Sequence, residues 1–190
     1  MAKKGLKYLK WGLTTSDDSY TDLPVHDQSK TFVIGRMNSA TYTPQTASGE
    51  IYGDDEIAEQ ATEMIGATIA TVLTEIDEEA AVVMFGEQMD EETGEIRSTI
   101  SDNPQTGGLC YYGVDQIRGA TVYTGYYYPR VTAVVAAETL NTKGSAITFG
   151  TYPVTFNSAS SKNGTVRVRK TFNDEDECRA WIDAKLPTSN

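Results

Sequence analysis

The side chains with the clearest chemical character are fifteen carboxylates between Glu50 and Glu95, a stretch without a single Lys or Arg. The rest of the chain has 16 basic and 12 acidic residues, so the formal net charge of −11 comes from this one segment. Such a segment either repels nucleic acid phosphate or forms an ordinary, well-hydrated acidic face. The fifteen carboxylates are Glu50, Asp54, Asp55, Glu56, Glu59, Glu63, Glu75, Asp77, Glu78, Glu79, Glu87, Asp90, Glu91, Glu92 and Glu95.

Other side chains that support catalysis or metal binding are few or badly spaced. The only histidine, His26, lies in a polar stretch, and no serine sits in a Gly-x-Ser-x-Gly sequence. Together with Cys110 and Cys178 it gives three scattered candidate zinc ligands. The acidic clusters lack the spacing of an EF-hand loop, and carboxylate pairs carry no information where acidic residues abound. We therefore expect no enzymatic activity, no cofactor and no metal site.

Length and composition predict one domain over residues 1–190, because 39% of these residues are hydrophobic. The N-terminus is basic, but Lys7 and Lys10 interrupt its apolar residues, so it does not resemble a signal peptide. No apolar stretch approaches the roughly 20 residues that span a bilayer. We expect a soluble protein made in the cytoplasm, with both cysteines reduced.

Most of the chain alternates polar and apolar residues with the period of β-strands. One segment, 64–76, also fits a helix, but its β-branched residues favour a strand. Long polar loops are expected near 14–30 and 87–108, the second with a small hairpin at Glu91–Ile96. The predicted strands are 6–13, 31–35, 37–43, 64–76, 109–114, 118–128 and 130–138, followed by a hairpin that pairs 147–156 with 165–172.

Two short helices interrupt this β pattern. The first has Asp77 as its N-cap and Gly86 as its stop. The second has Asn173 as its N-cap and ends before Pro187. Its apolar stripe must pack on the remainder of the protein, and comprises Cys178, Trp181, Ile182 and Leu186. The predicted fold is mainly β, a β-sandwich or barrel-like core with a short internal helix and a C-terminal α-helix.

The segment 131–137 is small and apolar on both of its alternating faces, which predicts cover on both sides. Either the C-terminal helix or a neighbouring subunit provides this cover, and the candidate contact residues are Val131, Ala133, Val134 and Val135. The preceding tyrosines resemble a stacking platform for sugars or single strands. Cross-strand packing is the more common role of strand tyrosines.

Six segments, taken in order, resemble the major tail proteins of long, non-contractile-tailed bacteriophages, the tail tube protein family. Gly53 departs from the alanine usual in this family's Leu-Tyr-Ala-Asp-Asp motif. The segments are the opening GLKYLKWGLTT, the motif at Ile51–Glu59, the acidic helix entry at Thr74–Phe85, the aromatic strand pair at Arg118–Ala137, the Thr-Lys-Gly-x-x-Ile-x-Phe pattern at Thr142–Phe149 and the closing helix at Thr171–Leu186.

This resemblance implies a structural protein of the virion tail, made in the bacterial host cytoplasm. Six copies would close into a ring and rings would stack into a tube, with a tape measure protein and tail terminator or tip proteins as partners. Double-stranded DNA would pass through an acidic lumen without specific binding. The candidate lumen-facing residues are Asp54, Asp55, Glu56 and Glu59. The alternative function is a carbohydrate- or surface-binding β-sandwich module of a phage tail or adhesin.

Overall fold

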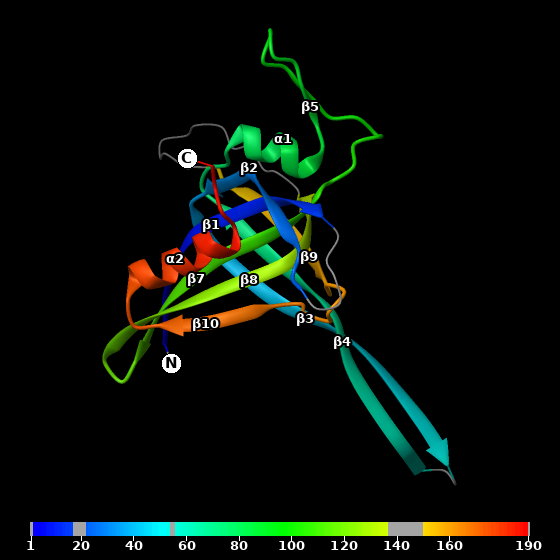
Figure 1. Ribbon diagram of the computed structural model, residues 1–190. Helices are drawn as coiled ribbons and strands as arrows, with labels where there is room; N and C mark the ends of the chain where they lie inside the picture. The colour runs from blue at the N-terminus through cyan, green and yellow to red at the C-terminus, as the bar shows by residue number, and fades with distance from the viewer. Residues whose placement is uncertain (1, 17–21, 54–55, 137–149, 190) are drawn as a thin grey trace, which may run out of the picture.

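The chain forms one strongly curled antiparallel sheet with a helix packed on each side of it (Figure 1). The computed structural model describes residues 2–16, 22–53, 56–136 and 150–189. The prediction of a mainly β fold with an internal and a C-terminal helix is confirmed. The strand order is β2-β1-β7-β8-β9-β4-β3, with β10 paired to β8. These strands are β1 (Ala2–Ser16), β2 (Val25–Gly35), β3 (Met37–Gly53), β4 (Glu56–Leu73), β7 (Thr106–Ile117), β8 (Ala120–Val135), β9 (Tyr152–Ala159) and β10 (Val168–Phe172).

Alternation along the strands divides the apolar residues between two cores. On β7, Leu109 and Tyr111 point into the concave interior of the sheet, whereas Cys110 and Tyr112 point to its outer side. Helix α1 (Glu78–Phe85) contributes Met84 and its neighbours to the interior core. Helix α2 (Glu175–Lys185) covers the outer core. The sheet is therefore buried on both faces in its middle, which explains why its central strands are apolar throughout.

Strand β8 is a single strand where the sequence predicted two, 118–128 and 130–138. Leu109 pairs with Tyr128 and Gly107 with Val131, so β8 has one extra residue at this point. Such a bulge accommodates Pro129, which has no N–H to donate to a ladder. It also changes the alternation, because Tyr128 and Val131 are three residues apart and both face the interior core.

The predicted hairpin between 147–156 and 165–172 is wrong. β10 pairs with the first half of β8, where Phe172 lies opposite Tyr123. β9 pairs with the second half of β8 and with β4. The two strands thus lie one after the other along the same edge of β8, because that sixteen-residue strand offers room for both. Each of the two strands therefore pairs with β8, instead of pairing with the other strand across the turn between them.

The helix ends follow local capping chemistry. The Asp77 side chain accepts a hydrogen bond from the Ala80 N–H, and Gly86 ends α1 in the left-handed conformation, as predicted. For α2 the predicted cap is wrong by one residue. Asp174 rather than Asn173 accepts hydrogen bonds from the backbone of the first turn. Because β10 extends to Phe172, the helix begins one residue later than the sequence suggested.

Helix α2 is fixed to the sheet by its apolar stripe and by one ion pair. Cys178, Ile182 and Leu186 are fully buried, as predicted, and the ring of Trp181 lies half-buried over the backbone of Gly125. A Cβ at residue 125 would come within 2.8 Å of that ring, so the close approach requires glycine. The buried Lys10 ammonium from β1 lies 2.6 Å from the Asp183 carboxylate.

The predicted loop 14–30 is mostly strand, so this prediction is wrong at both of its ends: β1 continues to Ser16 and β2 begins at Val25. His26 therefore lies within β2 rather than in a loop and is 5% exposed. Its Nε2 is 2.8 Å from the Tyr127 hydroxyl. Burial lowers the pKa of His26 to about 4. Because its neighbours in the sequence are polar, the sequence did not indicate that His26 lies on β2 with its side chain against Tyr127 of the outer core.

We expect the change Trp181→Ala to lower the free energy of unfolding by about 3 kcal/mol, the lower end of the range for a core aromatic, because the ring is only half-buried. Urea unfolding followed by tryptophan fluorescence of the remaining Trp11 measures the difference. An unchanged midpoint would mean that α2 contributes little to the stability of the sheet.

His26 makes stability depend on pH. The unfolded chain takes up a proton near pH 6.5 whereas the folded protein resists protonation to about pH 4. The free energy of unfolding should therefore fall by about 3 kcal/mol as the pH drops from 6.5 to 4. Thermal melts across this range should show a smaller loss for His26→Gln, which keeps a polar group near Tyr127. Equal losses in both proteins would contradict this assignment.

Candidate functional site

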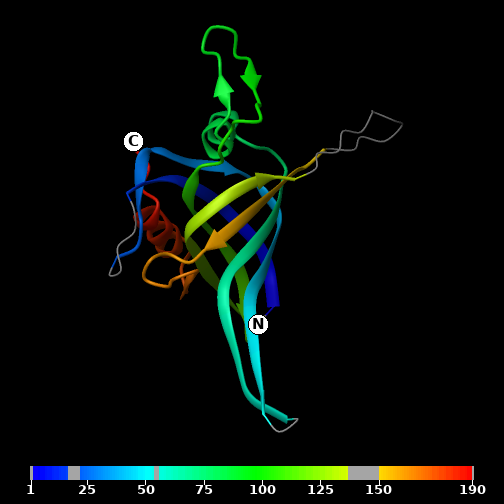
Figure 2. The ribbon, with the colours of Figure 1, turned by 90° about the vertical axis from the view of Figure 1, so that its right-hand side faces the viewer.

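The most prominent surface feature is a long hairpin that projects from the body of the protein (Figures 1 and 2). We call residues 43–53 of β3 and 56–65 of β4 the arm. Residues 45–50 and 60–65 are exposed on both faces of the hairpin, including the apolar Met64 and Ile65. A two-stranded hairpin without cover on either face is only marginally stable in water. This exposure favours contact with another molecule.

Two of the four predicted lumen residues, Glu56 and Glu59, belong to the arm, and the other two lie next to it in the sequence. Asp54 and Asp55 lie outside the described residues, between the two arm strands. Glu56 and Glu59 belong to β4, where their backbones pair with Gly53 and Ile51. The carboxylates of Glu50 and Glu63 are exposed farther back along the arm. The structure therefore brings this half of the acidic segment onto one projection.

The other half of the acidic segment follows α1 and forms a second projection at the opposite end of the molecule (Figure 1). Here β5 (Gln88–Met89) and β6 (Ile96–Arg97) pair around Gly94, which has a positive φ of 70°. This confirms the predicted small hairpin within the 87–108 loop. Ile100 beyond it is fully exposed.

A broad surface without charged side chains covers the outer side of β3, β4 and β9 and continues onto the end of β8, where it begins at Thr132, two residues after the exposed Arg130. One row of paired residues crosses it from strand to strand: Thr41, Ala70, Thr155 and Val134. A chain in which 23% of residues are charged rarely leaves such a surface neutral without a reason. We call these residues the neutral face: Ser39, Thr41, Thr43, Gln45, Gly66, Thr68, Ala70, Val72, Pro153, Thr155, Asn157, Ala159, Thr132, Val134 and Ala136.

The four predicted contact residues on β8 separate into two pairs. Val131 and Ala133 are buried in the interior core of the chain itself, so they are not available to a partner. Val134 and Val135 are 44% and 59% exposed. Helix α2, one of the two covers that the sequence left open, packs over Gly125 at the other half of β8 and does not cover Val134 and Val135.

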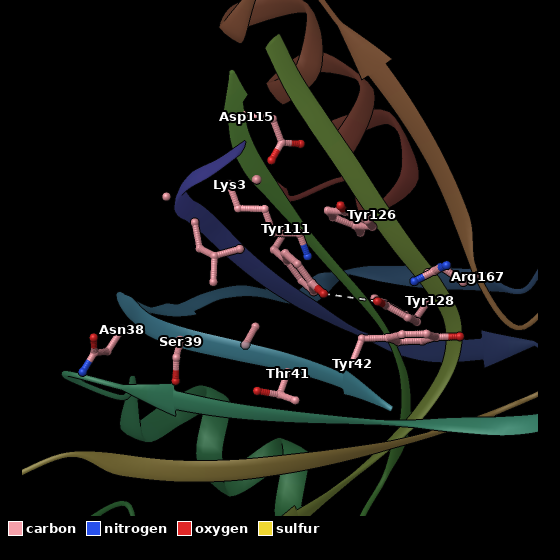
Figure 3. A pocket seen from close by; sticks show the side chains of 14 residues that line it. Lys3, Asn38, Ser39, Thr41, Tyr42, Tyr111, Asp115, Tyr126, Tyr128 and Arg167 are labelled. Carbon is pink, nitrogen blue, oxygen red and sulfur yellow. Dashed lines mark hydrogen bonds between the residues drawn. The ribbon is translucent and has the colours of Figure 1, made fainter. Parts of the chain in front are cut away.

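A cleft separates β1 from β3. The last pair between β1 and β2 is Leu9 with Gly35, after which β3 leaves β1 and pairs with β4. Two backbone hydrogen bonds fix this corner, from the Thr74 N–H to the Arg36 carbonyl and from the Asp77 N–H to the Ile34 carbonyl. A cavity of about 530 Å³ lies between the diverging strands (Figure 3).

The floor of the cleft is aromatic and its rim is cationic. The hydroxyls of Tyr111 and Tyr128 are 3.1 Å apart, and the Arg167 guanidinium stacks 4.0 Å from the ring centre of Tyr42. Burial raises the pKa of both Tyr111 and Tyr128, which keeps their hydroxyls neutral. Lys3 lies on the rim formed by β1 (Figure 3).

The tyrosine-rich strands do not form an exposed stacking platform. Tyr111 and Tyr128 belong to the interior core, whereas Tyr112 and Tyr127 lie under α2. This confirms cross-strand packing as their main role. The cleft itself was not predicted, because it arises from the divergence of β1 and β3, and the sequence gives no local signal for that divergence.

In the part of the chain that the structure describes, no group of three or more His, Cys, Asp or Glu side chains is arranged to hold a metal ion. No described helix is long and apolar enough to cross a membrane. No protein-family model matches the sequence, and no curated protein matches it significantly.

The two pairs on β8 should respond differently to substitution. Val135→Lys should change the free energy of unfolding by no more than about 0.5 kcal/mol, because its side chain is exposed, but should weaken self-association. Val131→Ala should cost about 1–3 kcal/mol, because it leaves a cavity in the core. Urea unfolding and sedimentation velocity measure the two effects. If the Val135→Lys protein self-associates as strongly as the wild type, Val135 takes no part in a contact between subunits.

Proposed function

We propose that this chain is the structural subunit of a phage tail tube, which assembles as stacked rings, six copies to a ring, and conducts DNA through an acidic lumen. The ordered resemblance of Ile51–Glu59, Thr74–Phe85 and Thr171–Leu186 to tail tube proteins suggests this function. The observation that carries it is the neutral face, because it spans four neighbouring strands of the sheet and ends on each side at backbone that has no described partner.

The open edges are those of β3 beyond Tyr42 and of the end of β8. Among the described strands, β3 pairs only with β4. The pairing of β8 with β7 ends at Thr132, so the other side of Val134 and Val135 has no described partner. Open edges are a liability in a monomer, because they recruit other chains. A head-to-tail contact that uses two different edges closes into a ring when its rotation permits.

The neutral face is suited to the wall of a bore through which DNA slides. Each phosphate held by a Lys or Arg would add salt-dependent affinity, and the neutral face has neither residue, although the exposed Arg130 borders it on β8. The neutral face overlaps the arm at Thr43 and Gln45. Farther along the arm, Ala47 lies two residues beyond Gln45 and pairs with Glu63. Glu63 thus joins Asp54, Asp55, Glu56 and Glu59 as a candidate for the acidic lining.

The subunit would work in the virion tail with a tape measure protein inside the tube and terminator or tip proteins at its ends. It would be made in the bacterial host cytoplasm, where the buried thiols of Cys110 and Cys178 remain free. In this assembly Val134 and Val135 lie at the subunit contact.

A second candidate is a carbohydrate- or surface-binding module. The cleft favours it, because its tyrosines and Arg167 form an aromatic and cationic cavity within the size range of ligand sites. Specific glycan binding by a chain that remains monomeric would support this function against the tube.

Negative-stain electron microscopy of the concentrated protein should show rings or uniform hollow tubes. Light scattering on the same sample should report the matching masses. A chain that remains monomeric with purified tail tip complex present as an initiator would contradict the proposal.

The same tubes test the lining. Wild-type tubes should not retain short double-stranded DNA at low salt, whereas tubes of Glu63→Lys should retain it and release it as salt is raised. Glu91→Lys is the matched control, because it makes the same charge change on the opposite projection. Equal retention by the two variants would place Glu63 away from the bore.

A further inference from the structure

The arm and the cleft are complementary in backbone and in charge. We propose that the cleft between β1 and β3 receives the arm of a second copy of this chain. This inference deepens the proposed tube, because it names one of the contacts between its subunits.

The cleft offers unpaired backbone on both of its sides. Residues of β1 that precede Leu9 pair with β7 on one side, and no described strand pairs with them on the side that faces β3. Asn38 to Tyr42 on β3 pair with β4 and face the cleft with their other edge. Five residues of strand span roughly 17 Å, long enough for several ladder hydrogen bonds. An extended segment that enters the cleft can therefore bond to the main chain as an added strand.

The arm supplies such a segment. Its two strands pair with each other through the register Ala47–Glu63 and Glu50–Gln60, which leaves the outer edge of each strand available. The pairing of β4 with β9 ends at Gly66, so β9 does not cover the arm. The arm therefore brings both extended backbone and exposed apolar side chains to a partner. No described residue of the same chain pairs with the outer edges of this backbone or covers these side chains.

The arm and the rim of the cleft carry opposite charges. The second projection is also acidic, but its strands β5 and β6 have only two residues each and are too short to add a strand to the cleft. The sequence from Thr43 to Gly66 has six carboxylates and no Lys or Arg. The rim of the cleft has Lys3 and Arg167. The one carboxylate that lines the cleft, Asp115, is 1% exposed and accepts a hydrogen bond from the Thr124 hydroxyl. An acidic arm and a cationic rim attract each other across the contact.

Two variants test separately the arm, which inserts, and the cleft, which receives it. In the first, residues 46–65 are replaced by Asn-Gly, which closes a two-residue turn between the paired residues Gln45 and Gly66 and removes the arm. In the second, Gly113→Phe fills the cleft, because Gly113 lines the cavity and an added Cβ meets no atom closer than 3.7 Å. Gly150→Phe is the matched control, at a position where an added Cβ meets nothing within 4 Å.

Sedimentation velocity tests the contact. Wild type and Gly150→Phe should self-associate, whereas the armless and cleft-filled proteins should each remain monomeric. Mixed in equal amounts, these two variants should form a one-to-one heterodimer, since one still has a cleft and the other an arm. Self-association of Gly113→Phe at wild-type affinity, or a mixture without heterodimers, would overturn the proposal. Thermal melts establish that both variants are folded.

Charge reversal gives an independent measurement. Arg167→Glu should weaken self-association at least tenfold, and higher salt should weaken the wild-type contact in the same direction. Arg169→Glu, two residues farther along and outside the cleft, is its control. Equal affinity of the two variants would overturn the role of the rim.

The arm–cleft contact and the tube are separate proposals, and the experiments can contradict either one without the other. Normal tubes built from Gly113→Phe chains would overturn the arm–cleft contact and leave the tube proposal standing. A heterodimer from the mixed variants, without tubes from the wild type, would do the reverse. Glycan binding that Gly113→Phe abolishes, with unchanged self-association, would assign the cleft to a sugar instead.

Discussion

The corner between β2 and β3 is the constraint on which the remainder of the structure depends. The segment after β4 crosses this corner and bonds to Arg36 and Ile34. Gly35 makes the crossing possible, because a Cβ there would lie 2.1 Å from the Glu75 carbonyl oxygen. With the corner fixed, β2 stays with β1 while β3 leaves to pair with β4. The cleft, the arm and the neutral face all follow from that single divergence.

The features that sequence reasoning could predict are those with local causes. Asp77 and Gly86 bound α1 because capping needs only a few neighbouring residues. Cys178, Ile182 and Leu186 are buried because a one-sided apolar stripe must face the sheet. The cap and apolar stripe near the end of the sequence predicted a C-terminal helix, and α2 lies there, one residue later than expected.

The features that it missed depend on competition between distant segments. β9 and β10 were expected to pair with each other, yet both pair with β8, which offers a longer edge than either can offer the other. His26 was assigned to a loop because its neighbours are polar, although the chain returns there to pair with β1. The cleft has no local signature at all, since its two sides are strands that fail to pair. For the same reason, the strands predicted at 37–43 and 64–76 stop at the base of the arm, whereas β3 and β4 extend to Gly53 and Glu56.

Charge is segregated in this molecule in a way that suits the proposed tube better than uniform acidity would. A bore that passes DNA must above all lack cations, and the neutral face meets that need without bringing like charges together. Six copies of a densely acidic wall would repel one another and oppose ring closure. Carboxylates concentrated on the arm instead leave the body free to pack, and they acquire a favourable partner wherever Lys3 and Arg167 of another copy lie within reach. The same acidic stretch can thus keep DNA from binding to the lining and direct subunits to one another.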